Sequence, residues 1–97
     1  MLELSGKTIK RLKALFPEET WEEAKLLLEK ECGDNIPFCE KSNKYQMERI
    51  RFAALKLSDG NIEKLREAVG MAQVDWRDLL MAAGFSEDIE AHQKWVI

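Results

Sequence analysis

Short segments bounded by glycine, proline and helix-capping residues are the sequence feature that most restricts the fold of this chain. Within each segment the apolar residues recur at spacings of three and four, which indicates helices. No segment alternates apolar and polar residues over the length of a strand. We predict helices over residues 6–16, 20–32, 43–57, 61–69, 75–83 and 86–95. The pattern therefore predicts an all-α fold, a compact bundle of five to six short helices without a sheet.

The segment from Asp75 to Phe85 carries signals for both ends of a helix. Asp75 is the expected N-cap, and Val74 and Leu79 stand at the two positions of a hydrophobic staple. Gly84 follows as the glycine that ends the helix. Four apolar residues share one face, which we expect to be buried: Trp76, Leu79, Leu80 and Ala83.

Other helix ends are marked in the same way. Ser5 is the expected cap of the first helix, and Pro17 stops that helix. Thr20 and Glu23 have the spacing of a capping box at the start of the second helix. Gly70 weakens the fourth helix, which we therefore expect to end near residue 69.

The first two predicted helices have opposite charge. Residues 6–16 contain four basic residues and no acidic one, whereas residues 18–31 contain six glutamates and two lysines. We expect the two helices to pack as an antiparallel hairpin, with each exposed ion pair contributing only about 0–1 kcal/mol.

The helix over residues 43–57 is apolar on two sides, so we expect it to be the central helix of the bundle. Arg51 then falls at the boundary of the core, where its charge needs a partner. The acidic pair Asp75 and Asp78 is our predicted partner for Arg51 or Arg49, as a structural salt bridge.

Length and composition indicate one globular domain over residues 1–97. Of these residues, 45% are apolar and 34% are charged, the balance of a soluble folded protein. No apolar run approaches the ~18 residues of a membrane span. The first seven residues lack the basic and apolar regions of a secretory signal. We therefore expect a cytoplasmic protein with no membrane partner.

Few residues are suited to catalysis or metal binding. His92 is the only histidine, and its place on an apolar helix face favours a packing role. Cys32 continues an apolar stripe and is expected to be a buried structural residue. Cys39 would need His92 as its base to act as a nucleophile, and two further ligands would be needed for zinc. We predict no catalytic, cofactor-binding or metal-binding residues, and no enzyme.

Two non-enzymatic functions remain. A helix-turn-helix would need residues 65–69, a turn at residues 70–74 and a recognition helix from Asp75. Asp75 and Asp78 would repel the phosphates, and the net charge of −3 also argues against a nucleic-acid partner. A protein-interaction module, bound to another protein or to itself as a homodimer, is the leading hypothesis. An exposed apolar patch would mark such a site, with these candidates: Leu26, Met81, Trp95 and Ile97.

The segments Glu48–Ser58 and Asp75–Phe85 together resemble those of a family of small bacterial helical proteins to which no activity is assigned. The resemblance covers about half of the chain or more. It implies a bacterial, intracellular, single-domain protein, and it transfers no catalytic or binding residue.

Overall fold

The fold is all-helical, as predicted from the sequence. The structure is a computed structural model, and it describes residues 4–32, 44–86 and 91–95. Its elements are α1 (Gly6–Leu15), a 3₁₀ turn η1 (Glu18–Thr20), α2 (Trp21–Glu31), α3 (Lys44–Ser58), α4 (Ile62–Ala83) and α5 (Ala91–Lys94). No strand occurs in these three described ranges. No helix within them is long and apolar enough to cross a membrane.

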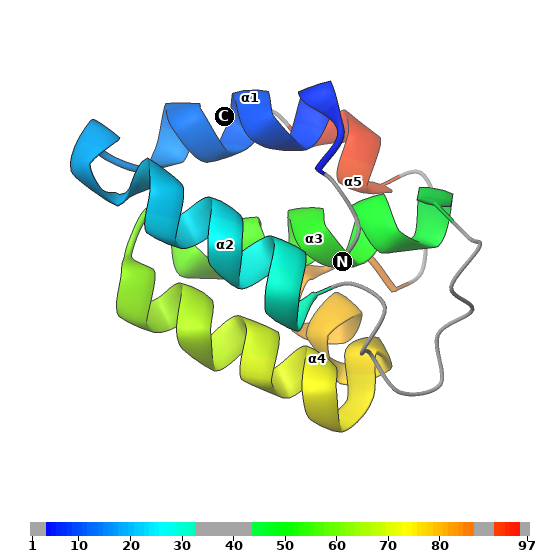
Figure 1. Cartoon of the computed structure of the whole chain (residues 1–97). Coiled ribbons are helices and arrows are strands. Elements are labelled where there is room, and N and C mark those ends of the chain that lie inside the picture. Colours follow the sequence, from blue (N-terminus) through cyan, green and yellow to red (C-terminus); the bar gives the residue numbers. More distant parts are fainter. Residues whose placement is uncertain (1–3, 33–43, 87–90, 96–97) are drawn as a thin grey trace.

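Helix α3 is the centre of the fold, which confirms the prediction from its two apolar sides. Every residue from Arg49 to Leu55 is buried, so this stretch is covered on all sides. Figure 1 shows α1 and α5 on one side of α3 and α4 on the other, with α2 packed against both α1 and α4.

The two ends of α1 lie where the sequence predicts them, but the predicted cap of α2 is wrong. Ser5 Oγ accepts a hydrogen bond from the Thr8 amide at 3.2 Å. In contrast, the Thr20 side chain accepts no capping hydrogen bond. Its hydroxyl instead donates to the Pro17 carbonyl oxygen at 2.9 Å. The 3₁₀ turn η1 runs directly into α2, and the Thr20 backbone is not extended as a capping box requires.

Helix α4 is longer than predicted because the expected break at Gly70 does not occur. The helix continues to Val74, and the backbone leaves helical geometry only at Asp75 (φ −159°, ψ 108°). A glycine costs a helix about 0.5–1 kcal/mol relative to alanine. The buried face of Ala68, Val69 and Ala72 offsets that cost.

Asp75 is the N-cap that the sequence predicts for the second part of α4. Its Oδ1 accepts a hydrogen bond from the Arg77 amide at 3.0 Å. The predicted staple is wrong, because Val74 is 76% exposed while Leu79 is completely buried. The predicted buried face is confirmed: Leu79, Leu80 and Ala83 are buried and Trp76 is half-buried against the core.

Gly84 ends α4 as predicted. It has a left-handed backbone (φ 81°, ψ 19°). The Gly84 and Phe85 amides donate to the Met81 and Leu80 carbonyl oxygens at 3.1 and 2.9 Å, which is the Schellman arrangement. Other predicted boundaries at Gly33 and Asn43, and residues 87–90 of the last predicted helix, lie outside the described residues.

The predicted ion pair between α3 and the aspartates of α4 is wrong. Among the hydrogen bonds and ion pairs of the described residues, both Asp75 oxygens accept from Arg77, and none joins Asp75 or Asp78 to Arg49 or Arg51.

Three basic side chains of α3 instead donate to backbone carbonyls at or just beyond the ends of neighbouring helices. Arg51 Nε donates to the carbonyl of Cys32, the C-cap residue of α2, at 2.8 Å. Arg49 donates to the carbonyl of Phe85, and Lys56 Nζ to that of Ala83 at 2.7 Å. The last carbonyls of a helix have no partner within it and carry its negative dipole end. The cations of α3 therefore satisfy the ends of α2 and α4 and bind them to the core.

Candidate functional site

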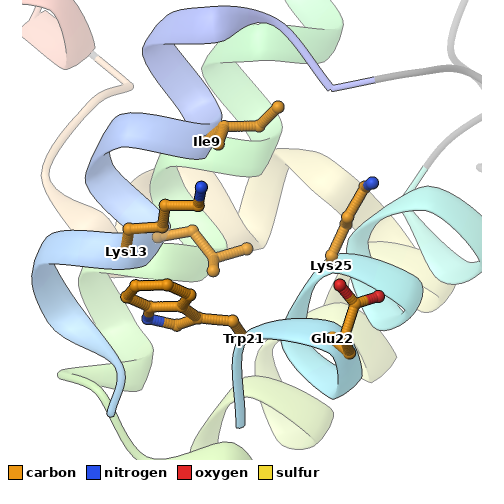
Figure 2. A pocket seen from close by; sticks show the side chains of 6 residues that line it. Ile9, Lys13, Trp21, Glu22 and Lys25 are labelled. Carbon is orange, nitrogen blue, oxygen red and sulfur yellow. The ribbon is translucent and has the colours of Figure 1, made fainter. Parts of the chain in front are cut away.

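A small open groove between α1 and α2 is the candidate site. Its volume is about 190 Å³. Six residues line it, three from each helix: Ile9, Leu12, Lys13, Trp21, Glu22 and Lys25. Figure 2 shows Lys13 and Lys25 standing on opposite sides of this space, with Trp21 between the two helices.

The spacing of residues along the two helices produces the groove. Ile9 and Lys13 are one helical turn apart on α1, and Trp21 and Lys25 are one turn apart on α2, so each pair forms one side. Leu12, which is buried, lies beneath them. The bottom of the groove is therefore apolar and its edges are charged.

A hydrogen bond holds the Trp21 ring in place. The indole Nε1–H donates to the carbonyl oxygen of Phe16 at 2.7 Å. Phe16 is the C-cap residue of α1, so this bond also satisfies a carbonyl at the end of that helix. The ring remains half-buried, and it offers a rigid apolar surface with few degrees of freedom to lose on binding.

The ammonium group of Lys13 lies over this ring, with Nζ 5.1 Å from the ring centroid. This distance is within the range of a cation–π contact, which contributes about 0.5–1 kcal/mol at an exposed site. Lys25 stands across the groove, next to Glu22 (Figure 2). The lining residues thus carry two positive charges and one negative charge.

Away from the groove, the pKa of Asp75 is shifted at the bend of α4. The hydrogen bonds from the Arg77 guanidinium and amide lower the pKa of the Asp75 carboxyl below its ordinary value. The same pairing raises the pKa of Arg77. The predicted recognition helix therefore begins with a basic side chain that is already bound to its own N-cap.

The turn that a helix-turn-helix would need is absent from the described part of α4. Residues 70–74 are helical, and a single residue, Asp75, separates the two helical parts. The geometry on which the nucleic-acid alternative depended is therefore not present.

The two reactive residues that the structure describes, His92 and Cys32, are both buried. His92 is buried, with its ring centroid 5.2 Å from that of Phe52 and 6.4 Å from that of Phe85. Cys32 is buried at the end of α2, as predicted, and Cys39 lies outside the described residues. Within the described residues there is no group of histidine, cysteine and acidic side chains that could hold a metal ion.

The candidate residues for an apolar patch come from separate elements. Leu26 on α2 is 44% exposed and Met81 on α4 is 65% exposed. Trp95 is half-buried, because its ring packs 6.2 Å from Phe52 and 6.3 Å from Phe85. Ile97 lies outside the described residues.

Sequence reasoning did not identify the groove. The sequence predicts only that the opposite charges of α1 and α2 attract each other. In the described structure the ion pair of α2 goes to α4 instead, between Glu23 and Arg66. The spacing of Trp21 and Lys25, one turn apart on α2, indicates one side of the groove. The other side, Ile9 and Lys13, comes to lie opposite them only when α1 packs on α2.

The structure is that of an all-helical protein with a small groove between two adjacent helices. Comparison with protein-family models, with curated proteins and with solved structures gave no match. The resemblance to small bacterial helical proteins therefore stays a prediction.

Proposed function

We propose that this protein is a non-enzymatic protein-interaction module, and that the groove between α1 and α2 receives an apolar side chain of its partner. The observation that supports this most directly is the combination of a half-buried tryptophan with an apolar floor in an open groove. Aromatic residues of this kind dominate the energetics of protein interfaces, where one side chain of the partner fills a small pocket.

The size of the groove favours a side chain over a cofactor. Sites for small molecules commonly enclose about 300–1,000 Å³, whereas this groove measures about 190 Å³ and is open to solvent. The lining also includes no histidine, cysteine, serine or aspartate. Glu22 and the two lysines are the ionisable groups present, and they stand at the edges.

A selection of random peptides on the immobilised protein tests this proposal. We expect enriched peptides to bind the native protein and to lose binding to Ile9→Glu, which places a charge on one apolar side of the groove. Val74→Glu is the matched control, because it adds the same charge at an apolar residue that is 76% exposed on α4.

Circular dichroism of both variants would show that each remains folded. Enriched peptides that bind Ile9→Glu as well as the native protein would overturn the assignment of the groove. Failure to enrich any peptide above the level of a blank surface would count equally against the proposal.

A further inference from the structure

We infer that the partner of the groove is an acidic protein segment, in which an apolar anchor residue is flanked on both sides by carboxylates. The inference rests on the proposed function and specifies the chemistry of the partner. It is carried by the placement of the charged residues around an apolar floor.

The charge of α1 is the first observation. The helix carries four basic residues and no acidic one: Lys7, Lys10, Arg11 and Lys13. Arg11 turns inward, where its guanidinium carbon lies 4.2 Å from the centroid of the Phe52 ring and its Nη2 donates to the Trp95 carbonyl at 3.2 Å. The three lysines remain exposed, so the surface beside the groove is positively charged.

The two lysines of the lining are the second observation. Lys13 from α1 and Lys25 from α2 are both exposed and stand on opposite sides of the apolar floor (Figure 2). A segment whose apolar residue enters the groove would place the residues before and after it near these two ammonium groups. Carboxylates at those positions would gain attraction at both edges.

Two glutamates of α2 differ in their relation to the groove. Glu23 points toward α4, where its carboxylate is paired with Arg66. Glu22 is the acidic residue of the lining, and it opposes an acidic partner. Glu22 therefore allows an opposite test. Removing its negative charge should strengthen the binding of an acidic partner, whereas removing the positive charge of a lysine should weaken it.

An acidic protein segment fits better than a nucleic acid. Both are anionic, but a nucleic acid has no aliphatic side chain to fill the floor formed by Ile9 and Leu12.

The experiment is a titration of the isotope-labelled protein, followed by NMR, with three synthetic peptides that share a central leucine. The first peptide has glutamates on both sides of the leucine, the second has glutamines and the third has lysines. We expect the glutamate peptide to shift the signals of Ile9, Lys13, Lys25 and the Trp21 indole. It should bind about 4- to 25-fold more tightly than the glutamine peptide at low salt, the product of two exposed ion pairs, and this advantage should shrink as salt screens the charges.

Four single variants test the individual charges with the glutamate peptide. Lys13→Gln and Lys25→Gln should each weaken binding by about two- to fivefold, the range for exposed ion pairs. Glu22→Gln should strengthen binding by a similar factor. Lys64→Gln on α4 is the matched control, since Lys64 is also exposed but lies away from the groove, and it should change binding by less than about 1.5-fold.

The outcomes separate the two proposals. If the glutamine or lysine peptide shifts the groove signals as strongly as the glutamate peptide, the acidic partner is wrong and the interaction module stands. If no peptide shifts these signals, both proposals fail. A single-stranded DNA that shifts them with an affinity equal to that of the glutamate peptide would also overturn the acidic protein segment.

Discussion

Two glycines with the same backbone conformation should respond very differently to substitution by alanine. Gly60, in the turn between α3 and α4, has φ 78°, and Gly84, at the end of α4, has φ 81°. Both lie in the left-handed region, which costs a residue with a Cβ about 1–2 kcal/mol. The two sites differ in the space around that Cβ.

At Gly60 the added atom would lie 2.4 Å from the carbonyl oxygen of Leu15 and 3.2 Å from its carbonyl carbon. These are backbone atoms at the end of α1, so the helix itself would have to move. At Gly84 the nearest atom would be Lys56 Nζ at 3.8 Å, an ordinary contact with a flexible side chain. Overpacking adds about 1–3 kcal/mol. We therefore expect Gly60→Ala to lower the free energy of unfolding by about 2–5 kcal/mol and Gly84→Ala by about 1–2 kcal/mol.

Thermal and urea unfolding, followed by circular dichroism, would measure these differences. In a domain of this size 1 kcal/mol shifts Tm by about 4–8 °C, so Gly60→Ala should melt at least about 4 °C below Gly84→Ala. Gly70→Ala should change the free energy of unfolding in the opposite direction. Gly70 is exposed within α4 with no atom within 4 Å of a built Cβ, so alanine should stabilise the protein by about 0.5–1 kcal/mol.

If alanine at Gly60 and at Gly84 destabilised the protein equally, the predicted clash with the Leu15 carbonyl would be refuted. The loss at both sites would then come from the left-handed backbone alone. A destabilising effect of Gly70→Ala would show that α4 does not continue through this residue. In that case the break expected from the sequence would be correct.

Three further predictions concern a helix cap, a carboxyl group and the core. Ser5→Ala should cost about 0.5–2 kcal/mol in urea unfolding because Ser5 caps α1, whereas Thr20→Ala, at a residue with no capping bond, should cost less than about 0.5 kcal/mol; equal costs would contradict these assignments. Hydrogen bonds from Arg77 lower the folded-state pKa of Asp75, so its stabilisation is present above the unfolded-state pKa and is lost as pH falls through the folded-state value. The Tm difference between the native protein and Asp75→Asn should therefore shrink below about pH 4, and a difference that stays constant between neutral and acidic pH would be inconsistent with this pairing. Phe52→Ala, at a completely buried ring, should cost about 3–5 kcal/mol, and a loss below about 1 kcal/mol would mean that the ring is not in the core.

The sequence predicted much of the local structure and little of the candidate site. Ser5, Asp75 and Gly84 were identified as helix ends because each signal depends on residues within four positions of one another. The prediction of Thr20 as an N-cap is wrong, although Thr20 and Glu23 have the spacing of a capping box. Its hydroxyl had a competing acceptor in the Pro17 carbonyl, which becomes available only when the chain forms the turn η1.

The groove could not be predicted in the same way. Trp21 is separated from Ile9 by a complete change of chain direction, and its indole is fixed by the backbone carbonyl of Phe16. The identities of the side chains do not indicate which backbone carbonyls of the folded chain lack a backbone hydrogen-bond donor. For the same reason the sequence predicts carboxylate partners for Arg49 and Arg51, whereas their partners include backbone carbonyls, those of Phe85 and Cys32.

Patterns within short stretches of the sequence predict that the fold is all-helical, that Ser5 and Pro17 bound α1, that Gly84 ends α4, and that Leu79, Leu80 and Ala83 are buried. These features follow from periodicity and from capping interactions between near neighbours. Tertiary packing, in contrast, establishes that α4 continues through Gly70, that Arg51 and Lys56 of α3 bind the ends of α2 and α4, and that α1 and α2 form a groove. Each of these depends on burial or on backbone groups brought together from distant parts of the chain, where packing energies exceed local propensities.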